Sequence, residues 1–153
     1  MYYNTVMRPD WKDHQQMPKP KNDDGYFETM SRAVFAAGLN WKVIDNKWPE
    51  IKTAFENFSV RKVAGYHQDN IDKLMSDKRV VRNFKKLNAV VTNAKAIVLL
   101  QKHYKSVANY LDSFKDQPKE KLLKDLGKRF SFMGTTTAQM FLYGCGEKTS
   151  HLG

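Results

Sequence analysis

Residues 129–145 read RFSFMGTTTAQMFLYGC, and this stretch decides the fold. An aromatic turn leads to Gly134, after which apolar residues recur at the spacing of a helix. We expect the hydroxyl of Thr135 or Thr136 to cap that helix. A glycine turn that opens a helix exposes free backbone N–H groups, which can hold an anion such as a phosphate. The alternative is an ordinary turn between two core helices.

A second helix is predicted directly before this turn. Residues 119–126 carry leucines at helical spacing, and Pro118 suits the start of a helix. Residues 119–145 are therefore predicted to form a helix-hairpin-helix unit, which can grip a DNA backbone without reading its sequence. The residues that we expect to contact DNA all belong to this unit: Lys128, Arg129, Phe132, Gly134, Thr135 and Thr136.

The remainder of the chain also predicts helices. Residues 1–25 are irregular and are expected to form an N-terminal arm that Trp11 anchors on a single helical domain of residues 26–153. No segment alternates as a strand would, so the fold class is all-α. The expected helices cover residues 26–37, a short segment from Trp41, a third helix opened by Pro49, residues 63–66, 71–75, a long helix 80–98, and 104–114.

The charge of the chain is strongly positive and uneven. Lys and Arg number 26 against 16 Asp and Glu, a formal net charge of +10. Residues 1–50 are balanced, with seven basic and seven acidic side chains, so the excess belongs to residues 51–153. This pattern favours an anionic partner, with nucleic acid ahead of an acidic membrane surface. An incidentally basic surface is the alternative.

The compartment is predicted from what the sequence lacks. Cys145 is the only cysteine, which rules out an intrachain disulfide. The first ten residues have no apolar core typical of a secretory signal, and the longest apolar run, residues 96–100, is too short to span a bilayer. We expect a cytoplasmic monomer that has no membrane partner.

Three stretches together resemble a known family. They are AGLNW at residues 37–41, VVRNFKKLNAVVTNA at 80–94 and FSFMGTTTAQMFLYGCG at 130–146. In this order they resemble the DNA-3-methyladenine glycosylase I family of helix-hairpin-helix repair enzymes, over roughly residues 26–151. The resemblance implies an all-α enzyme that binds duplex DNA, flips an alkylated base into a pocket and hydrolyses its N-glycosidic bond.

The resemblance also implies a base pocket lined by a tryptophan, a tyrosine and a glutamate. Trp41 falls on the tryptophan, Trp11 falls near the tyrosine, and Ala33 stands in place of the glutamate; Phe35 completes the predicted pocket. Aromatic faces suit a cationic base through stacking and cation–π attraction. Loss of a hydrogen bond between a carboxylate and that base costs about 1.5–3 kcal/mol. We therefore expect a divergent member of the family with an altered base preference or reduced activity.

The zinc site of the family is predicted to be lost, and no cofactor is expected. The N-terminal cysteine is absent, Lys12 replaces a histidine, and of the expected ligands His151 alone is matched. A structural zinc site needs four ligands. Related glycosylases carry a catalytic aspartate just before the pair that corresponds to Ser150 and His151. It is absent here, which argues against excision of stable, uncharged bases, and no catalytic residue is assigned.

Two other functions stay open from the sequence. One is a non-catalytic DNA-binding relative with a degenerate base pocket. The other is a small helical interaction protein whose basic surface is incidental. DNA affinity that weakens steeply with salt separates both DNA-binding hypotheses from the interaction protein. An assay for abasic sites then separates the enzyme from the binding relative.

Overall fold

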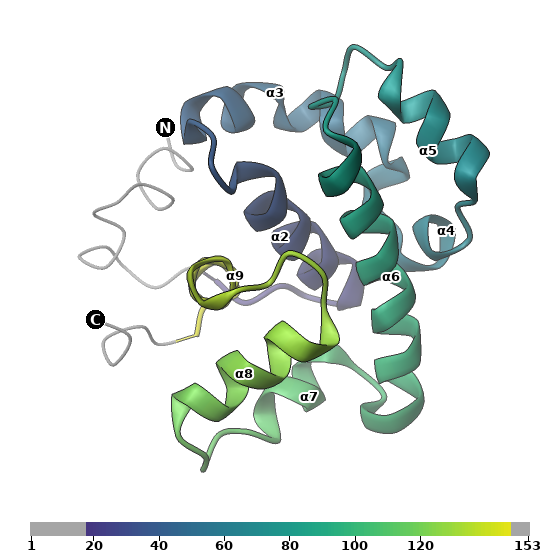
Figure 1. Ribbon diagram of the computed structural model, residues 1–153. Helices are drawn as coiled ribbons and strands as arrows, with labels where there is room; N and C mark the ends of the chain where they lie inside the picture. Colours follow the sequence, from purple (N-terminus) through teal and green to yellow (C-terminus); the bar gives the residue numbers. More distant parts are fainter. Residues whose placement is uncertain (1–17, 148–153) are drawn as a thin grey trace.

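The computed structural model describes residues 18–147, and every regular element in that range is helical (Figure 1). The predicted all-α fold is confirmed. None of the described helices combines the length and the apolar character that a bilayer crossing requires. The elements in chain order are α2 (Asp23–Ala36), α3 (Trp41–Ala54), the 3₁₀ helix η2 (Glu56–Phe58), α4 (Val60–Ala64), α5 (Gln68–Met75), α6 (Phe84–Tyr104), α7 (Val107–Asp112), α8 (Lys119–Arg129) and α9 (Thr135–Gly144).

Helix α2 lies at the centre of the domain, in contact with α3, α6 and α9. It begins at Asp23, three residues before the predicted domain boundary, because the side chain of Asn22 caps it by accepting from the Gly25 N–H. The carboxylate of Asp23 then accepts from the Val107 N–H at 2.9 Å, and that of Asp24 accepts from the Val60 N–H at 2.9 Å. The first turn of α2 therefore holds the starts of α7 and α4.

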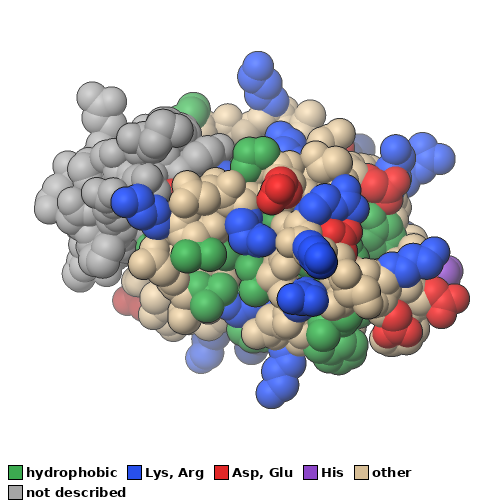
Figure 2. All heavy atoms as spheres, turned by 90° about the horizontal axis from the view of Figure 1, so that it is seen from above, with side chains coloured by type: hydrophobic (Ala, Val, Ile, Leu, Met, Phe, Trp, Pro, Cys, Tyr) green, Lys and Arg blue, Asp and Glu red, His purple; other side chains and the backbone are tan. Residues whose placement is uncertain are grey.

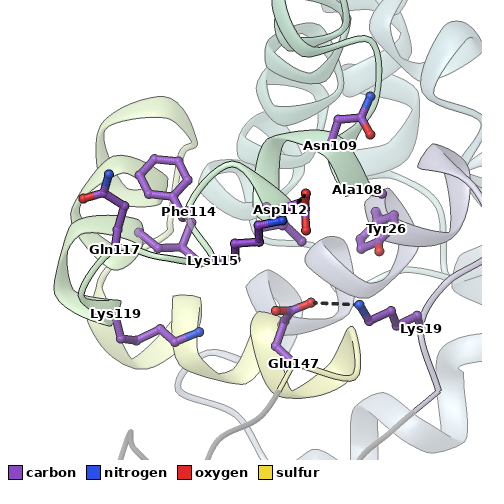
Figure 3. Close-up of a pocket in the computed structure, with 12 residues that line it drawn as sticks. Lys19, Tyr26, Ala108, Asn109, Asp112, Phe114, Lys115, Gln117, Lys119 and Glu147 are labelled. Atoms are coloured by element: carbon purple, nitrogen blue, oxygen red, sulfur yellow. Dashed lines mark ion pairs between the residues drawn. The ribbon is translucent and has the colours of Figure 1, made fainter.

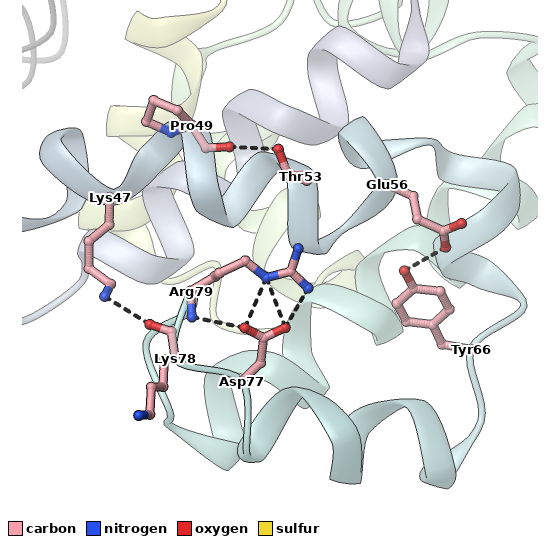
Figure 4. A network of polar contacts seen from close by, with 8 residues as sticks. All are labelled: Lys47, Pro49, Thr53, Glu56, Tyr66, Asp77, Lys78 and Arg79. Carbon is pink, nitrogen blue, oxygen red and sulfur yellow. Dashed lines mark hydrogen bonds and ion pairs between the residues drawn. The ribbon is translucent and has the colours of Figure 1, made fainter.

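Helix α3 is one continuous helix, so the prediction of two helices separated before Pro49 is wrong. Proline in a helix interior removes a backbone donor and costs about 3 kcal/mol. Ile44 and Ile51, which precede and follow Pro49 in the sequence, have fully buried side chains that hold the helix against the core. The Thr53 hydroxyl donates to the carbonyl of Pro49 at 3.0 Å, as Figure 4 shows.

A left-handed turn follows α3 and supports an aromatic cluster. Glu56, Asn57 and Phe58 all have positive φ angles, of 54°, 60° and 55°. This turn stacks the Phe58 ring on Phe55 at 5.2 Å and on Trp48 at 5.2 Å. Left-handed backbone is strained in residues other than glycine. Burial of these rings offsets the strain, because Phe55 and Phe58 are fully buried.

Helix α6 is the longest helix and packs against α2, α4, α5 and α7. It begins at Phe84, four residues later than predicted, because Asn83 takes the capping position and accepts from the Lys86 N–H. It ends where Lys105 adopts a left-handed φ of 73°. The Ser106 side chain then caps α7, which is shorter at both ends than the predicted helix 104–114.

Candidate functional site

The helix-hairpin-helix unit is present, with α8 and α9 packed against each other and joined by residues 130–134 (Figure 1). Phe130 and Met133 point into the core and are 5% and 2% exposed. Between them Phe132 has a left-handed φ of 60° and is 39% exposed. The alternation of buried and exposed side chains holds the turn against the domain while it presents an apolar ring to solvent.

The start of α9 has no side-chain cap. Gly134 occupies the capping position, and Thr135 and Thr136 lie inside the helix, so the prediction that a threonine caps it is wrong. Both threonines are exposed, and a Cβ placed on Gly134 would meet no atom within 4 Å. The first N–H groups of a helix without a cap favour an anion, and the helix dipole adds to that preference.

A buried asparagine from α6 holds the turn. The side-chain oxygen of Asn93 accepts from the Ser131 N–H at 2.7 Å, and its amide nitrogen donates to the Ser131 carbonyl at 3.1 Å. Asn93 is 1% exposed. Its role was missed in the sequence, although a polar residue on the apolar face of α6 was a visible signal. The turn is therefore fixed by the domain and not by α8 and α9 alone.

The two basic residues at the end of α8 have different surroundings. The Nε of Arg129 lies 3.0 Å from the Asp125 carboxylate, and its guanidinium lies over the rings of Tyr104 and Tyr110 at 5.6 and 5.0 Å. Burial acts to lower the pKa of Arg129, but hydrogen bonding and charge from Asp125 outweigh it and raise the pKa. Lys128 faces solvent. Lys128 is thus exposed beside the turn, while Arg129 ties α8 to α7.

The described residues include three of the four predicted pocket residues, so the pocket as a whole is not tested. Trp41 is the first residue of α3 and is partly buried, next to the core. Phe35 is fully buried, with its ring 6.3 Å from Trp48 and 5.8 Å from that of Phe55. Ala33 is 3% exposed, and Trp11 lies outside the described residues. The base pocket therefore stays a prediction.

A buried lysine fixes the turn that leads to Trp41. The ammonium of Lys86 donates to the carbonyls of Phe35 and Ala37 at the end of α2, at 3.0 and 2.5 Å. Lys86 is 5% exposed, and this burial lowers its pKa. In the sequence, the basic residues Arg79, Arg82, Lys85 and Lys86 fit either a DNA-contacting face or the solvated side of a helix. For Lys86 both interpretations are wrong, because its side chain is buried. A lysine cation at the carboxyl end of a helix also complements the helix dipole.

Arg79, from the same basic group, is paired within the domain. Its guanidinium binds the Asp77 carboxylate, with Nη2 at 2.6 Å (Figure 4). More generally, Lys and Arg side chains on the face in Figure 2 are spread among Asp and Glu side chains and do not gather in one band.

Polar contacts also run between α2 and α3. Glu28 accepts from the indole N–H of Trp48 at 2.8 Å and pairs with Lys52 at 3.2 Å. The guanidinium of Arg32 lies 4.4 Å from the centre of the Trp48 ring and 2.9 Å from the Asp45 carboxylate. Arg32 and Asp45 were not singled out from sequence, because charged residues usually mark a surface.

A cavity of about 580 Å³ lies beside α7 and the start of α8 (Figure 3). Lys19 and Glu147 pair across one side at 3.9 Å, and Lys115 pairs with Asp112 at 3.9 Å. The cavity borders Leu122 in the first turn of α8, whereas the hairpin turn follows the last turn of α8, at the opposite end of this helix. It includes none of the predicted site residues.

The positions that the resemblance implies for zinc ligands, including Lys12 and His151, lie outside the described residues. Within residues 18–147 no cluster of three or more His, Cys, Asp or Glu side chains could hold a metal ion. Burial raises the pKa of the Cys145 thiol, which disfavours the thiolate that zinc binds. No step of the chemistry is assigned to a metal.

Comparisons with known proteins agree on one family. The chain is 27% identical over 158 residues to DNA-3-methyladenine glycosylase 1 of Escherichia coli (strain K12), covering 86% of this chain and 84% of that protein. It is 29% identical over 154 residues to DNA-3-methyladenine glycosylase of Haemophilus influenzae (strain ATCC 51907 / DSM 11121 / KW20 / Rd), covering 88% and 83%.

Solved structures share the fold. A structure of 3-methyladenine DNA glycosylase I from Staphylococcus aureus, solved to explain 3-methyladenine recognition, matches with a TM-score of 0.77 and 26% identity. The match covers 94% of this chain and 90% of that one. A family model described as methyladenine glycosylase matches residues 9–125, which is most of the chain. The chain belongs to the methyladenine glycosylase family.

Proposed function

We propose that this protein is a DNA glycosylase that removes cationic alkylated purines, such as 3-methyladenine, from duplex DNA. The observation that carries the proposal is the hairpin: an exposed turn and an uncapped helix N-terminus, held by Asn93, in a chain of this family. The relatives from E. coli and H. influenzae are named for activity on 3-methyladenine in DNA.

In this proposal the hairpin holds the DNA backbone. The N–H groups of Thr135 and Thr136 would contact one phosphate, and the ammonium of Lys128 would neutralise a neighbouring one. Phe132 lies in the turn between Lys128 and Thr135 and is exposed. These contacts carry no sequence information, which suits an enzyme that must examine damage in any context. We further propose that the protein acts as a monomer in the cytoplasm.

The chemistry needs little from the protein beyond binding. A 3-alkylated adenine in DNA carries a positive charge, so its bond to the sugar is already weak. When that bond breaks, its electron pair neutralises the base, water adds to the sugar carbon, and the proton of that water passes to solvent. The base must first be flipped, which costs a few kcal/mol, and less for a damaged base. Trp41 would stack on the flipped cation, with Trp11 as the second predicted aromatic.

The test is release of 3-methyladenine from methylated duplex DNA, measured by mass spectrometry of the freed base. The wild-type protein should release it and leave abasic sites. The Trp41→Ala variant should lose release by about 5–30-fold, since stacking and cation–π contacts are worth roughly 1–2 kcal/mol. Its affinity for undamaged duplex should be unchanged. Val43→Ala, an exposed position in the same helix, is the control and should behave as wild type.

A second candidate function has one observation in its favour. Ala33 is buried and supplies no carboxylate to a base. If salt-dependent DNA binding is found without any base release, the protein is a DNA-binding relative that has lost the reaction. Release of the base at the rate of the E. coli relative would instead show that alanine at position 33 does not reduce activity.

A further inference from the structure

The cavity beside α7 has the volume of a small-molecule site, and the proposed reaction gives it no role. Its volume of about 580 Å³ lies within the range of about 300–1,000 Å³ that is common for ligand sites. Leu111 and Leu122 form a buried apolar part of its wall, at 5% and 4% exposed. Polar side chains from α2, α7 and the start of α8 also line it, as Figure 3 shows. The cavity therefore combines a surface for an apolar body with groups that can bind polar ones.

A buried tyrosine lines this cavity. Tyr26, in the first turn of α2, is 4% exposed and belongs to the cavity wall (Figure 3). Within residues 18–147 its hydroxyl makes no hydrogen bond. Burial and neighbouring acidic groups raise the pKa of Tyr26 to about 12, so the hydroxyl keeps its proton. Because buried polar groups in proteins nearly always have a hydrogen-bond partner, we expect this hydroxyl to donate to a ligand.

The start of α8 brings positive charge to the same cavity. Pro118 occupies the capping position and no side chain caps the helix, so its first N–H groups lack a helical carbonyl. Lys119, the first residue of α8, lines the cavity and is partly buried. Within residues 18–147 its ammonium has neither an ion pair nor a hydrogen bond. Glu120, the acidic residue of this first turn, is exposed and does not line the cavity.

The other charged groups around the cavity form weak pairs of opposite sign. Lys19 lies 3.9 Å from Glu147, and Lys115 lies 3.9 Å from Asp112. Both lysine side chains are 67% exposed, and exposed ion pairs at such distances contribute little. Among the described charged residues of the wall, three lysines therefore face two acids, and Lys119 supplies the excess positive charge.

We propose that this cavity is a binding site for a nucleoside monophosphate, with the phosphate at the start of α8. The ammonium of Lys119 and the first N–H groups of α8 bind the phosphate oxygens, and the helix dipole adds to the attraction. Lys115 exchanges its weak pair with Asp112 for the phosphate. A phosphate has three terminal oxygens and up to two negative charges, so it uses these donors more fully than a carboxylate can.

The nucleoside lies on the remaining wall of the cavity. Leu111, Leu122 and the partly buried ring of Phe114 contact its apolar surface. The Tyr26 hydroxyl donates to a ring nitrogen of the base, and purines carry several such acceptors. Duplex DNA does not suit this site, because a double helix cannot reach side chains as buried as those of Tyr26 and Leu122.

The test measures binding of three ligands to the full chain by isothermal titration calorimetry. Deoxyadenosine monophosphate has both parts, deoxyadenosine lacks the phosphate, and inorganic phosphate lacks the nucleoside. The monophosphate should bind at least about tenfold more tightly than either part, because each charged hydrogen bond to the phosphate adds roughly a factor of ten. A monophosphate that does not bind, or that binds no more tightly than either part, would overturn the proposal.

Two variants each remove one contact. Lys119→Gln should weaken binding of the monophosphate by about 5–10-fold, allowing for partial exposure of the lysine. Tyr26→Phe should weaken it by about 3–10-fold and leave binding of inorganic phosphate unchanged. Neither the ammonium nor the hydroxyl has a partner within residues 18–147, so both variants should melt at the wild-type temperature. Binding of the monophosphate at wild-type strength by either variant would refute the assigned contacts.

Two control variants test whether the ligand binds in this cavity. Lys121→Gln, exposed in α8 and outside the cavity wall, should bind the monophosphate as wild type does. Trp41→Ala should do so too, and a loss there would assign the ligand to the predicted base pocket and overturn the proposal.

DNA affinity distinguishes a free nucleotide from a DNA strand as the source of the phosphate. Lys119→Gln should leave the salt dependence of duplex affinity unchanged. A slope of log affinity against log salt that falls by about 1 would assign Lys119 to the DNA backbone and overturn the proposal. Base release by the wild type tests the proposed function separately, because the calorimetry does not depend on it.

Discussion

The side chain of Asn93 and the backbone of Ser131 form a two-bond clamp, with the amide oxygen accepting at 2.7 Å and the amide nitrogen donating at 3.1 Å. The two residues are 38 positions apart, and the clamp joins the middle of α6 to the hairpin turn. Phe132, directly after the clamped residue, takes a left-handed φ of 60°. The clamp thus stabilises a backbone conformation that a phenylalanine does not favour by itself.

Asn93→Ala should lower the free energy of unfolding by about 2–3 kcal/mol, because it removes two buried hydrogen bonds and leaves backbone groups unpaired. It should also weaken DNA binding, since the turn loses its fixed shape. Urea unfolding and duplex affinity measure the two effects. The control is Asn109→Ala. The exposed side chain of Asn109 donates one hydrogen bond through its amide nitrogen, to the Tyr104 carbonyl. Equal losses in the two variants would contradict a special role for the clamp.

Lys128→Gln should reduce the salt dependence of DNA binding. If the Lys128 ammonium neutralises one phosphate, the slope of log affinity against log salt should fall by about 1. Affinities measured at several salt concentrations give the slope. Lys121→Gln is the matched control, because Lys121 is exposed in the same helix but two turns from the hairpin. An unchanged slope in Lys128→Gln would remove this residue from the DNA interface.

The hairpin and the all-α class could be predicted because both follow local pattern. Apolar spacing and the glycine turn of residues 127–134 mark two helices whatever surrounds them. Helix boundaries were less secure. Thr135 was predicted as a cap from its residue type, yet Gly134 occupies that position. Pro49 was predicted at the start of a helix, yet it lies inside α3, which is held against the core by packing.

The polar contacts inside the domain could not be predicted, because they depend on which helices meet. Lys86 and Arg32 have long charged side chains that usually indicate a surface. Lys86 is buried where the end of α2 supplies carbonyls, and Arg32 where α3 supplies a carboxylate and an aromatic face. Neither partner lies near its residue in the sequence.

Gly144→Ala should destabilise the contact between α2 and α9. A Cβ at this position would lie 2.7 Å from the Thr29 Cγ2, and the Thr29 hydroxyl is committed to the Gly25 carbonyl at 3.0 Å. Overpacking of this kind costs about 1–3 kcal/mol. Thr29→Ser removes the obstructing methyl group and keeps the hydroxyl, so it should recover most of the loss. A double-mutant cycle in urea measures the coupling, and additive effects would refute the steric explanation.

A carboxylate between α7 and α8 should make stability depend on acid pH. The Tyr110 hydroxyl donates to Asp125 at 2.5 Å, and Arg129 donates to the same oxygen at 3.0 Å. Partial burial acts to raise the pKa of Asp125, but these two hydrogen bonds and the charge of Arg129 outweigh it and hold the pKa below its ordinary value. The folded state therefore favours the ionised carboxylate.

A lowered pKa fixes the direction of the pH effect. Asp125 contributes its full stabilisation above its unfolded pKa of about 3.9, and the contribution is lost as pH falls through the lower folded value. Asp125→Asn should lower the free energy of unfolding at pH 7 by about 1–2 kcal/mol, allowing for partial exposure. Below about pH 4 the difference from wild type should shrink, because acid removes the same charge. Urea unfolding from pH 7 to pH 2.5 measures it, with exposed Asp112→Asn as the control. A difference that stays constant over this range would show that the ionised form of Asp125 is not what stabilises the fold.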